Sequence, residues 1–367
     1  MTNQILHNQT EPMNNVTSTC SCGHRNPLHC ILPPYVLDHL LEHEDAAVRK
    51  IARDNMVAAA EMRAVRSVLP SLRPMSMVAL SSAGKYREVY DAQHHPTSVL
   101  PGKLMRSEGQ PKTGDPTADE AYDYSGVTYD YYKTVHGRDS LDNHGLRLVS
   151  SVHVGVKFNN AFWNGAQMAY GDGDGTIFQR FTKSLDVVGH ELTHGVVSNS
   201  ADLIYQGESG ALNEHYADVF GTLIKQHKAR QTVGKADWLI GKDVITPAPT
   251  RKAIRSMAAP GTAYTNDPLL GTDPQPGHLK NRYRGAEDNG GVHINSGIPN
   301  HAFYLVAMAM KGKAWLTVGP VWYEVLTTRL VRTSQFADMA RETIDVAGKS
   351  GAAMKKAVKA AWKSVGL

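Results

Sequence analysis

The chain has 367 residues, of which 41% are hydrophobic and 20% are charged, and its formal net charge is +4. These values are ordinary for a soluble protein, and the length fits two or three compact units with a buried core. The positive charge is spread thinly rather than gathered into a basic tract, which argues against nucleic acid as a partner. The longest apolar stretches, such as residues 302–310, are far shorter than the roughly 20 residues of a membrane span. We therefore expect a soluble protein with no membrane span.

The start of the chain is polar and carries all three cysteines. Residues 1–30 are expected to be disordered, and no apolar core of a Sec signal peptide is visible. We therefore expect secretion by a non-classical route, with a cytoplasmic location as the alternative. Cys20, Cys22 and Cys30, together with nearby histidines, could form a small metal knuckle, or they could be reduced thiols of a mobile tail. The rest of the chain then has no disulfides.

Residues 31–80 are predicted to form a small helical unit followed by a linker. Pro33 and Pro34 mark the beginning of a helix near Tyr35. From residue 68 to 84 the composition shifts to Pro, Ser and Met, which is typical of an exposed linker that proteases cut easily.

The remainder divides into a β-rich lobe over residues 81–198 and an α-helical lobe over residues 199–367. In the first lobe, alternating β-formers predict strands at 86–91 and 146–158, and a helical rhythm predicts a helix at 122–136. Long amphipathic helices then dominate, and we place them at 186–198, 209–228, 295–311, 315–330, 334–347 and 351–364. The predicted fold class is therefore α+β, with two lobes.

Residues 190–194 match the pattern H-E-x-x-H, which is typical of zinc proteases. On a helix, residues four apart lie on the same face, so His190 and His194 can direct their imidazoles at one ion. Glu191 then lies beside that ion. Catalytic zinc usually takes three protein ligands and keeps one position for water, so the rest of the sequence has to supply a third ligand.

Glu214 is the candidate third ligand, because it lies on a second strongly periodic segment 20 residues beyond His194. That spacing leaves room for a turn, a loop and an antiparallel helix. Asp218 lies four residues later on the same face, where it can accept the second N–H of His190, as carboxylates do for zinc-bound histidines. We therefore predict one catalytic zinc ion. A carboxylate beside zinc can take a proton from attacking water, which makes Glu191 the predicted general base.

Two further motifs make the resemblance to a known family specific. The residues around the predicted zinc match the gluzincin pattern H-E-x-x-H…E-x-x-x-D, while residues 159–165, N-N-A-F-W-N-G, and residues 288–296, D-N-G-G-V-H-I-N-S, resemble stretches of the thermolysin family. The resemblance runs from about residue 100 to the C-terminus. It implies a two-lobed α+β catalytic unit with zinc in the cleft between a β-rich and an α-helical lobe. It also implies a neutral metalloendopeptidase that hydrolyses internal peptide bonds.

The same resemblance gives roles to residues around the zinc. His293 and Tyr205 are expected to stabilise the oxyanion of the tetrahedral intermediate, and Asp288 to orient His293. A single Tyr in an apolar run is more often a core residue, but its position nine residues before Glu214 matches the family motif. Arg255 is expected to hydrogen-bond a substrate carbonyl next to the scissile bond, with a surface salt bridge as the alternative.

The resemblance also implies how substrate is held. Asn160 and Ala161 resemble the family's edge-strand contacts, which bind an extended peptide as an added strand. An apolar pocket is expected to accept the side chain after the cut, and its expected lining is Phe178, Phe181, Val187, Ile240, Val244 and Ile254. We therefore expect cleavage before bulky hydrophobic residues, at the P1′ position, because a buried apolar side chain contributes roughly 1.5–3 kcal/mol.

The chain departs from the family at the double calcium site that its best-known members carry next to the zinc. Asp186 and Asp237 remain, but Lys225, Leu239 and Lys242 stand where the family pattern has carboxylates or their neighbours. We expect the lysine ammonium groups to replace the calcium ions by pairing with the two aspartates. Calcium at this double site is therefore not expected.

The segment around Pro33, Pro34 and Tyr35 resembles the P-P-Y motif of the short propeptides in the protealysin-like branch of the family. That resemblance implies an inactive precursor, whose propeptide covers the cleft as an intramolecular inhibitor until cleavage near residues 70–85 releases it. A permanent helical cap is the alternative. A thiolate from one of the N-terminal cysteines could also occupy the open position on the zinc.

Two other functions fit the sequence less well. An aminopeptidase of the wider gluzincin group would share the zinc motif, but the sequence has no G-x-M-E-N stretch to hold a free substrate amine. A non-catalytic binding module would not need Glu191, Tyr205 and His293 together. We therefore expect peptides or proteins as substrates, the propeptide as an intramolecular partner, and a monomer.

Overall fold

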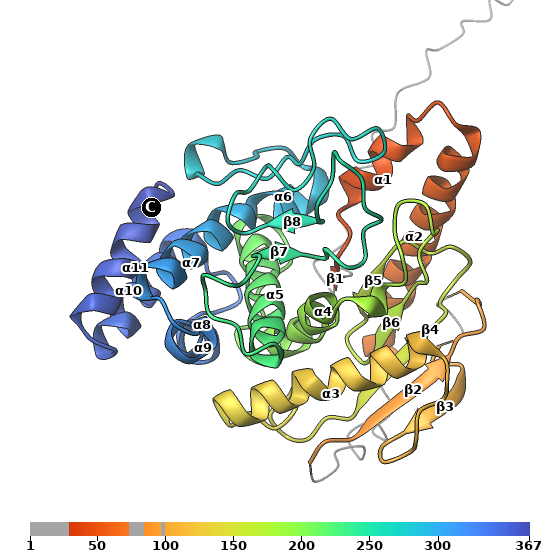
Figure 1. Ribbon diagram of the computed structural model, residues 1–367, viewed down its shortest axis with the longest axis horizontal. Helices are drawn as coiled ribbons and strands as arrows, with labels where there is room; N and C mark the ends of the chain where they lie inside the picture. The colour runs from red at the N-terminus through yellow and green to blue at the C-terminus, as the bar shows by residue number, and fades with distance from the viewer. Residues whose placement is uncertain (1–28, 73–83, 97–99) are drawn as a thin grey trace, which may run out of the picture.

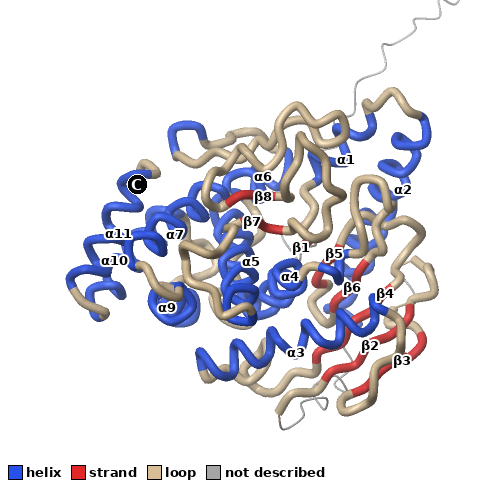
Figure 2. Tube along the Cα trace, viewed as in Figure 1, coloured by secondary structure: helices blue, strands red, loops and turns tan. Residues whose placement is uncertain are grey.

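The computed structural model describes residues 29–72, 84–96 and 100–367. The disorder was predicted for residues 1–30, and residues 1–28 of that segment lie outside the described part of the chain. Strands gather on one side of the molecule, and long helices fill the other side (Figures 1 and 2). This arrangement confirms the predicted α+β class, with a sheet in the N-terminal part and helices in the C-terminal part.

The described chain begins with three elements: β1 (His29–Cys30), α1 (Pro34–Leu41) and α2 (Ala46–Leu72). Pro34 opens α1 at a position where its fixed φ suits a helix and its missing N–H is not needed. Two details differ from the sequence expectation. The two residues of β1 are ordered within the segment expected to be disordered, and α2 continues to Leu72, beyond residue 68 where the linker was expected.

Among the described residues, one sheet of six strands forms the core of the N-terminal part. After β1, its strands are β2 (Arg87–Asp91), β3 (Lys103–Ser107), β4 (Leu148–Val152), β5 (Ala161–Trp163) and β6 (Met168–Tyr170). Their order is β1-β5-β6-β4-β2-β3. The strands β2, β4 and β6 are parallel, and β1, β3 and β5 pair antiparallel with their neighbours. The N-terminal strand β1 therefore forms one edge of the sheet, next to β5.

Helices dominate the rest of the described chain. Helix α3 (Pro116–His136) packs on the sheet. The helices that follow it are α4 (Leu185–Ser198), α5 (Gly207–Lys228), α6 (Glu287–Asn295), α7 (Gly297–Met310), α8 (Ala314–Thr317), α9 (Gly319–Thr328), α10 (Phe336–Lys349) and α11 (Ala352–Ser364). Two short strands, β7 (Leu239–Ile240) and β8 (Arg255–Ser256), pair beside α5. The single helix predicted at 315–330 is two helices, because Pro320 lacks the N–H that would continue α8. None of the described helices could span a membrane.

The helices α4 and α5 pack against each other at the centre of the molecule (Figure 1). Glycine allows their close approach: a Cβ atom at Gly221 would lie 2.5 Å from the carbonyl oxygen of Asp186 and 3.1 Å from the backbone nitrogen of His190. Every residue of α4 from Asp186 to Val197 is buried. This contact brings the H-E-x-x-H face of α4 against the face of α5 that carries the second half of the zinc motif.

Candidate metal centre and substrate cleft

The three predicted zinc ligands meet between α4 and α5. His190 and His194 project from α4 with their Nε2 atoms 3.1 Å apart. Glu214 projects from α5, with its Oε2 3.5 Å from Nε2 of His190 and its Oε1 3.5 Å from Nε2 of His194. All three side chains are fully buried. Ligands of a tetrahedral zinc ion with bonds near 2.0–2.1 Å lie about 3.4 Å apart, so this spacing suits zinc.

The hydrogen bonding of these three side chains also suits a bound cation. The Oε2 atom of Glu214 is buried and has no hydrogen-bond partner among the described residues. Such an atom costs free energy unless something satisfies it, and a divalent cation would do so. Together with two imidazole nitrogens aimed at the same point, this carboxylate forms a centre that can bind one metal ion.

Two side chains hold the imidazoles from behind. The Nδ1 of His190 lies 2.8 Å from Oδ1 of Asp218, as predicted, and the Nδ1 of His194 lies 2.8 Å from Oδ1 of Asn213. Each acceptor fixes the tautomer in which Nδ1 carries the proton and Nε2 offers its lone pair to a metal. The sequence reasoning missed Asn213, although its place directly before Glu214 on α5 could have suggested it.

Glu191 is buried beside this centre. Its Oε2 accepts a hydrogen bond of 3.1 Å from the backbone N–H of Trp163 on β5. Burial, and then the charge of Glu214, raise the pKa of the Glu191 carboxyl well above its usual range, although the backbone N–H groups of Trp163 and Ile31 oppose this. A carboxyl group in this environment can accept a proton and return it within one reaction, as a general base must.

His293 and Tyr205 lie on the other side of the centre. The Tyr205 hydroxyl donates a hydrogen bond to Glu214 and lies 3.1 Å from Nε2 of His293, whose Nδ1 lies 2.5 Å from Asp288. Burial lowers the pKa of His293, but the charges of Glu214 and Asp288 outweigh it and raise the pKa to about 9. In its protonated form, His293 can donate a hydrogen bond from Nε2 while Asp288 accepts from Nδ1.

The D-N-G-G stretch explains how Asp288 reaches His293. All four of its residues have left-handed backbone angles, with φ between 50° and 80°. The chain therefore turns sharply before the regular part of α6, and Asp288 accepts the backbone N–H of His293 at 2.8 Å as well as its side chain. Gly290 and Gly291 adopt this conformation without the strain that a Cβ atom would bring.

Arg255 on β8 is completely buried, which excludes the alternative of a surface salt bridge. Its Nε and Nη2 atoms donate to the two carboxylate oxygens of Asp218 at 2.9 and 2.8 Å. This paired contact raises the pKa of the guanidinium and keeps the pKa of Asp218 far below its usual range, despite the burial of both groups. The remaining Nη1 donates to the carbonyl of Ile31 at 2.9 Å.

The N-terminal segment lies in the cleft as an added strand. Cys30 pairs antiparallel with Phe162 on β5, and the next residue, Ile31, donates its N–H to the carbonyl of Ala161 at 3.3 Å. Leu32 donates its N–H to Oδ1 of Asn160 at 3.1 Å. These are the groups predicted to bind an extended substrate, and the chain's own residues 30–32 use them.

The carbonyl oxygen of Cys30 points at the catalytic candidates, 2.9 Å from Nε2 of His293. The thiol of Cys30 donates to the carbonyl oxygen of Leu32, which lies 3.6 Å from Sγ. Cys30 is not part of the buried metal-donor group found among the described residues. A Cys30 thiolate at the open zinc position stays a prediction, and Cys20 and Cys22 lie outside the described residues.

The two residues after Cys30 are buried in the main hydrophobic core. Ile31 and Leu32 are 0% and 1% exposed. The predicted pocket residues are all buried in the same hydrophobic cluster as Ile31, and they are Phe178, Phe181, Val187, Ile240, Val244 and Ile254. The sequence reasoning missed Ile31 and Leu32, whose signal was two aliphatic residues directly before the P-P-Y motif.

The predicted pairing of lysines with Asp186 and Asp237 is present. Lys225 Nζ lies 3.0 Å from Oδ2 of the fully buried Asp186 and 3.5 Å from Oδ1 of Asp237. Lys242 contacts Asp237 from the other side at 3.6 Å. Burial lowers the pKa of Lys225, but the charges of the two aspartates outweigh this effect and raise the pKa above its usual value. The ammonium group therefore stays charged.

Comparison with known proteins gives the same picture. Residues 73–198 match the family described as thermolysin metallopeptidase, catalytic domain, and residues 201–367 match its alpha-helical domain. An extracellular metalloprotease of Pectobacterium carotovorum subsp. carotovorum is 45% identical over 93% of this chain and 97% of its own length. Protease PrtS of Photorhabdus sp. (strain Az29) is 41% identical over 92% and 91% of the two chains.

A solved structure extends the likeness to the N-terminal segment. The precursor of protealysin, a metalloproteinase from Serratia proteamaculans, superposes with a TM-score of 0.82 at 46% identity, over 92% of this chain and 99% of that one. The matches cover both lobes and the segment that precedes them. The chain therefore belongs to the thermolysin family of metallopeptidases and is a metalloendopeptidase with the fold of a protealysin-like precursor.

Proposed function

We propose that this protein is a zinc-dependent endopeptidase that cuts internal peptide bonds before bulky hydrophobic residues and is made as an inactive precursor. One observation carries the proposal. The chain's own residues 30–32 lie across the predicted catalytic groups in the manner of a peptide substrate, with the Cys30 carbonyl 2.9 Å from Nε2 of His293 and the Ile31 carbonyl 2.9 Å from Nη1 of Arg255. The site is therefore suited to an extended peptide, and that peptide is at present its own.

The residues around the centre suit hydrolysis of a peptide bond. A zinc ion held by the two histidines and Glu214 would polarise the substrate carbonyl and make water a better nucleophile at neutral pH. Glu191, fixed by Trp163, takes the proton of the attacking water and passes it to the leaving amine. His293 and Tyr205 donate hydrogen bonds to the oxyanion that develops.

The preference at P1′ follows from the position of Ile31. Its carbonyl accepts from Arg255 and its N–H donates to Ala161, so a substrate residue with the same contacts places its side chain where that of Ile31 lies. The surrounding cluster is apolar. Leucine, isoleucine and phenylalanine after the cut should therefore be favoured over polar residues.

Inhibition follows from the same contacts, since substrate and the N-terminal segment need the same hydrogen bonds. The helices behind the segment hold it in place. Val36, Leu37 and Leu40 of α1 are buried in the main core, and Asn55 of α2 accepts the backbone N–H of Asn159 at 2.6 Å. The propeptide is thus fixed next to the edge strand that it occupies.

Relatives support a location for the enzyme. One of them is named an extracellular metalloprotease, which supports secretion of this chain. A non-classical route remains our expectation for its export. We also propose that it acts as a monomer, with proteins or peptides as substrates and its propeptide as an intramolecular partner.

The test is to incubate the purified precursor with zinc or with a zinc chelator, sequence the new N-terminus, and sequence the products of a casein digest and of end-blocked peptides. We expect activity to appear with loss of the propeptide, and cuts before hydrophobic residues. A fully active, uncut chain would contradict the inhibitory role. Activity confined to free N-termini would instead favour an aminopeptidase.

The variant Glu191→Gln is the sharpest test of the chemistry. It should lower hydrolysis by several orders of magnitude while the protein keeps its zinc, because Gln has the shape of Glu but cannot accept the proton. Metal analysis of the same sample is the control. Persistent hydrolysis by the variant would show that Glu191 is not the base.

A further inference from the structure

Three side chains outside the cleft meet at one edge of the sheet. The parallel strands β2, β4 and β6 end side by side, and His94, His153 and Asp172 follow just beyond their carboxyl ends. Backbone hydrogen bonds continue past the strands, from His94 N to the carbonyl of His153 at 2.8 Å and from Val154 N to that of Tyr170 at 3.1 Å. The three loops are therefore held in a fixed arrangement.

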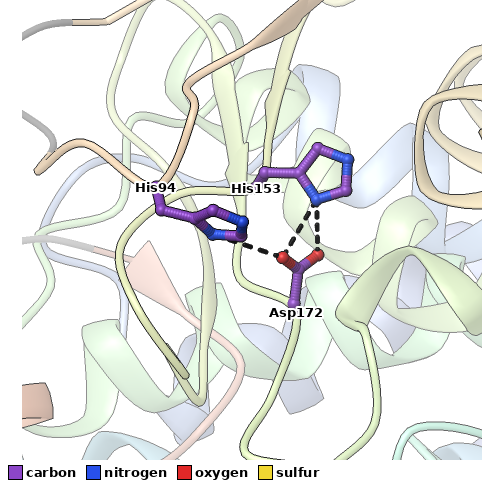
Figure 3. Close-up of side chains that lie close together, drawn as sticks. All are labelled: His94, His153 and Asp172. Atoms are coloured by element: carbon purple, nitrogen blue, oxygen red, sulfur yellow. Dashed lines mark hydrogen bonds and ion pairs between the residues drawn. The ribbon is translucent and has the colours of Figure 1, made fainter.

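The donor atoms of these side chains converge (Figure 3). The Nδ1 of His153 lies 2.9 and 3.0 Å from the two carboxylate oxygens of Asp172, and the Nδ1 of His94 lies 3.7 Å from Oδ2 of the same carboxylate. All three ligand atoms lie within 4.8 Å of one another. This spacing is close to the distance of about 3.4 Å between the ligands of a tetrahedral zinc ion.

A fourth residue prepares His153 as a metal ligand. Its Nε2 lies 2.9 Å from Oδ2 of Asp115. Asp115 is itself fixed, because it caps α3 and its Oδ1 accepts the backbone N–H groups of Thr117 and Ala118. A carboxylate that takes the Nε2 proton leaves Nδ1 as the atom that can bind a metal, which is the usual arrangement behind a metal-bound histidine.

The backbone is unusual at both histidines. His94 and His153 have φ values of 58° and 53°, in the left-handed region that residues with a Cβ seldom adopt. Backbone strain of this kind persists where the surrounding structure fixes it, and it often marks functional positions. Here it gives the two imidazoles their positions on either side of Asp172 (Figure 3).

The cluster is open enough for an ion to enter. The His94 side chain is 56% exposed, which leaves room for its ring to turn from the Gly155 carbonyl that its Nδ1 also contacts at 3.1 Å. The side chains of His153 and Asp172 are 18% and 27% exposed. The pKa of His153 is raised to about 9, chiefly by its hydrogen bond to Asp172. A bound cation would take the place of the proton that lies between His153 and Asp172.

We infer that His94, His153 and Asp172 form a second metal site, separate from the catalytic centre, for a divalent transition-metal ion such as zinc. Two imidazoles and one carboxylate favour zinc, nickel or copper over calcium or magnesium, which prefer all-oxygen ligands. Water would complete the coordination on the exposed side. A bound ion would join the ends of three strands and so stabilise this edge of the sheet.

The site can be tested in the full-length chain that carries Glu191→Gln, which should not cut itself. His94→Ala removes one ligand, and His95→Ala is the matched control, because His95 is an exposed neighbour of the same type. Zinc binding is measured by calorimetry with zinc chloride, and melting temperature is measured with and without zinc. Circular dichroism checks that both variants are folded, and Asp172→Asn provides a second ligand variant.

We expect the His95→Ala protein to bind one more equivalent of zinc than the His94→Ala protein. The melting temperature of the His95→Ala protein should rise when that additional ion binds, and the His94→Ala protein should lack this rise. The difference between the two variants decides the result, so zinc bound at the catalytic centre or by the N-terminal cysteines does not affect it. Equal zinc stoichiometry in the two variants would overturn the proposal. A response to calcium chloride as strong as that to zinc would overturn the assignment to transition metals.

Discussion

Asn213 shows how a single side chain sets the properties of the metal centre. Its Oδ1 accepts from His194 Nδ1, while its amide donates to the carbonyl of Leu203 at 3.1 Å, so its orientation is fixed from both ends. Asn213→Ala should therefore weaken zinc binding by about 10- to 100-fold, since the imidazole loses the group that holds its tautomer. Zinc retention against a graded chelator measures the effect.

The conservative variant provides the control for this prediction. Asn213→Asp keeps an acceptor for His194 and should retain zinc far better than Asn213→Ala. If both variants lost zinc equally, loss of local packing rather than loss of the acceptor would be the cause.

Ile31 is the residue on which inhibition by the propeptide should depend most. In Ile31→Asp, a carboxylate would have to enter the hydrophobic core, and the lost apolar burial alone is about 2–3 kcal/mol. The segment should then leave the cleft roughly 30- to 160-fold more often, and the intact precursor should cut a fluorogenic peptide correspondingly faster. Initial rates before any processing measure this.

Val57→Asp is a matched control for that experiment, because Val57 lies on α2 of the same segment but is 58% exposed. Its precursor should stay as inactive as the unchanged chain. Equal activity of the two variant precursors would show that Ile31 does not close the cleft.

At the scale of elements, the contact of α5 with α4 contains an ion pair between Lys225 and the buried Asp186. Lys225→Met would leave the fully buried Asp186 without its nearest cation, which should lower the free energy of unfolding by about 3–5 kcal/mol. Lys242→Met should cost less than about 1 kcal/mol, because the Lys242 side chain is 51% exposed. Denaturant unfolding of the Glu191→Gln chain avoids self-digestion.

The same contact predicts the response to calcium. A calcium-selective chelator at fixed zinc should leave the melting temperature unchanged, since ammonium groups already neutralise the aspartates. A clear loss of stability with the chelator would show that calcium binds despite the lysines.

The end of α3 predicts how stability depends on pH. His136 stacks on Tyr323, with the ring centroids 4.1 Å apart, and burial lowers its pKa to about 4. An unfolded histidine takes up its proton near pH 6.5, so between about pH 6.5 and 4 the unfolded state binds more protons. Stability should therefore be intact above this window and fall as the pH decreases through it, by up to about 3 kcal/mol.

His136→Phe separates this effect from other acid-sensitive groups. It keeps a flat ring against Tyr323 but removes the titration, so its free energy of unfolding should fall less than that of the parent between pH 7 and pH 5. Denaturant unfolding at both pH values measures the difference. Identical losses would exclude His136 as a source of acid sensitivity.

At the scale of the whole molecule, local sequence patterns predicted many of the helices and site residues, whereas the pairing of segments distant in sequence was not predicted. The helical period places His190 and His194 on one face, and the spacing to Glu214 and Asp218 follows from two packed helices. The two-residue strand β1 has no comparable signal, because its partners are distant in sequence. Leu32 and Asn160 are 128 positions apart, and Cys30 and His293 are 263 apart.

The second cluster of histidines was beyond sequence reasoning for a related reason. His94, His153 and Asp172 come from three separate loops, and only the parallel order of β2, β4 and β6 brings these loops to one edge. No fixed spacing in the chain expresses that order. Motifs on one helix or two packed helices are readable from sequence, whereas sites at the ends of a sheet need the topology.

The strand in the cleft is joined to the enzyme that it blocks, and this connection gives inhibition its strength. A tethered ligand competes at an effective concentration that can reach the order of millimolar, so micromolar substrate cannot displace it. Cutting the chain after α2 would turn the same segment into a separate ligand that can diffuse away. Specific activity of the cut enzyme should then rise on dilution, whereas that of the intact precursor should not. A protease of this kind would remain silent where it is concentrated and become active where it is dilute.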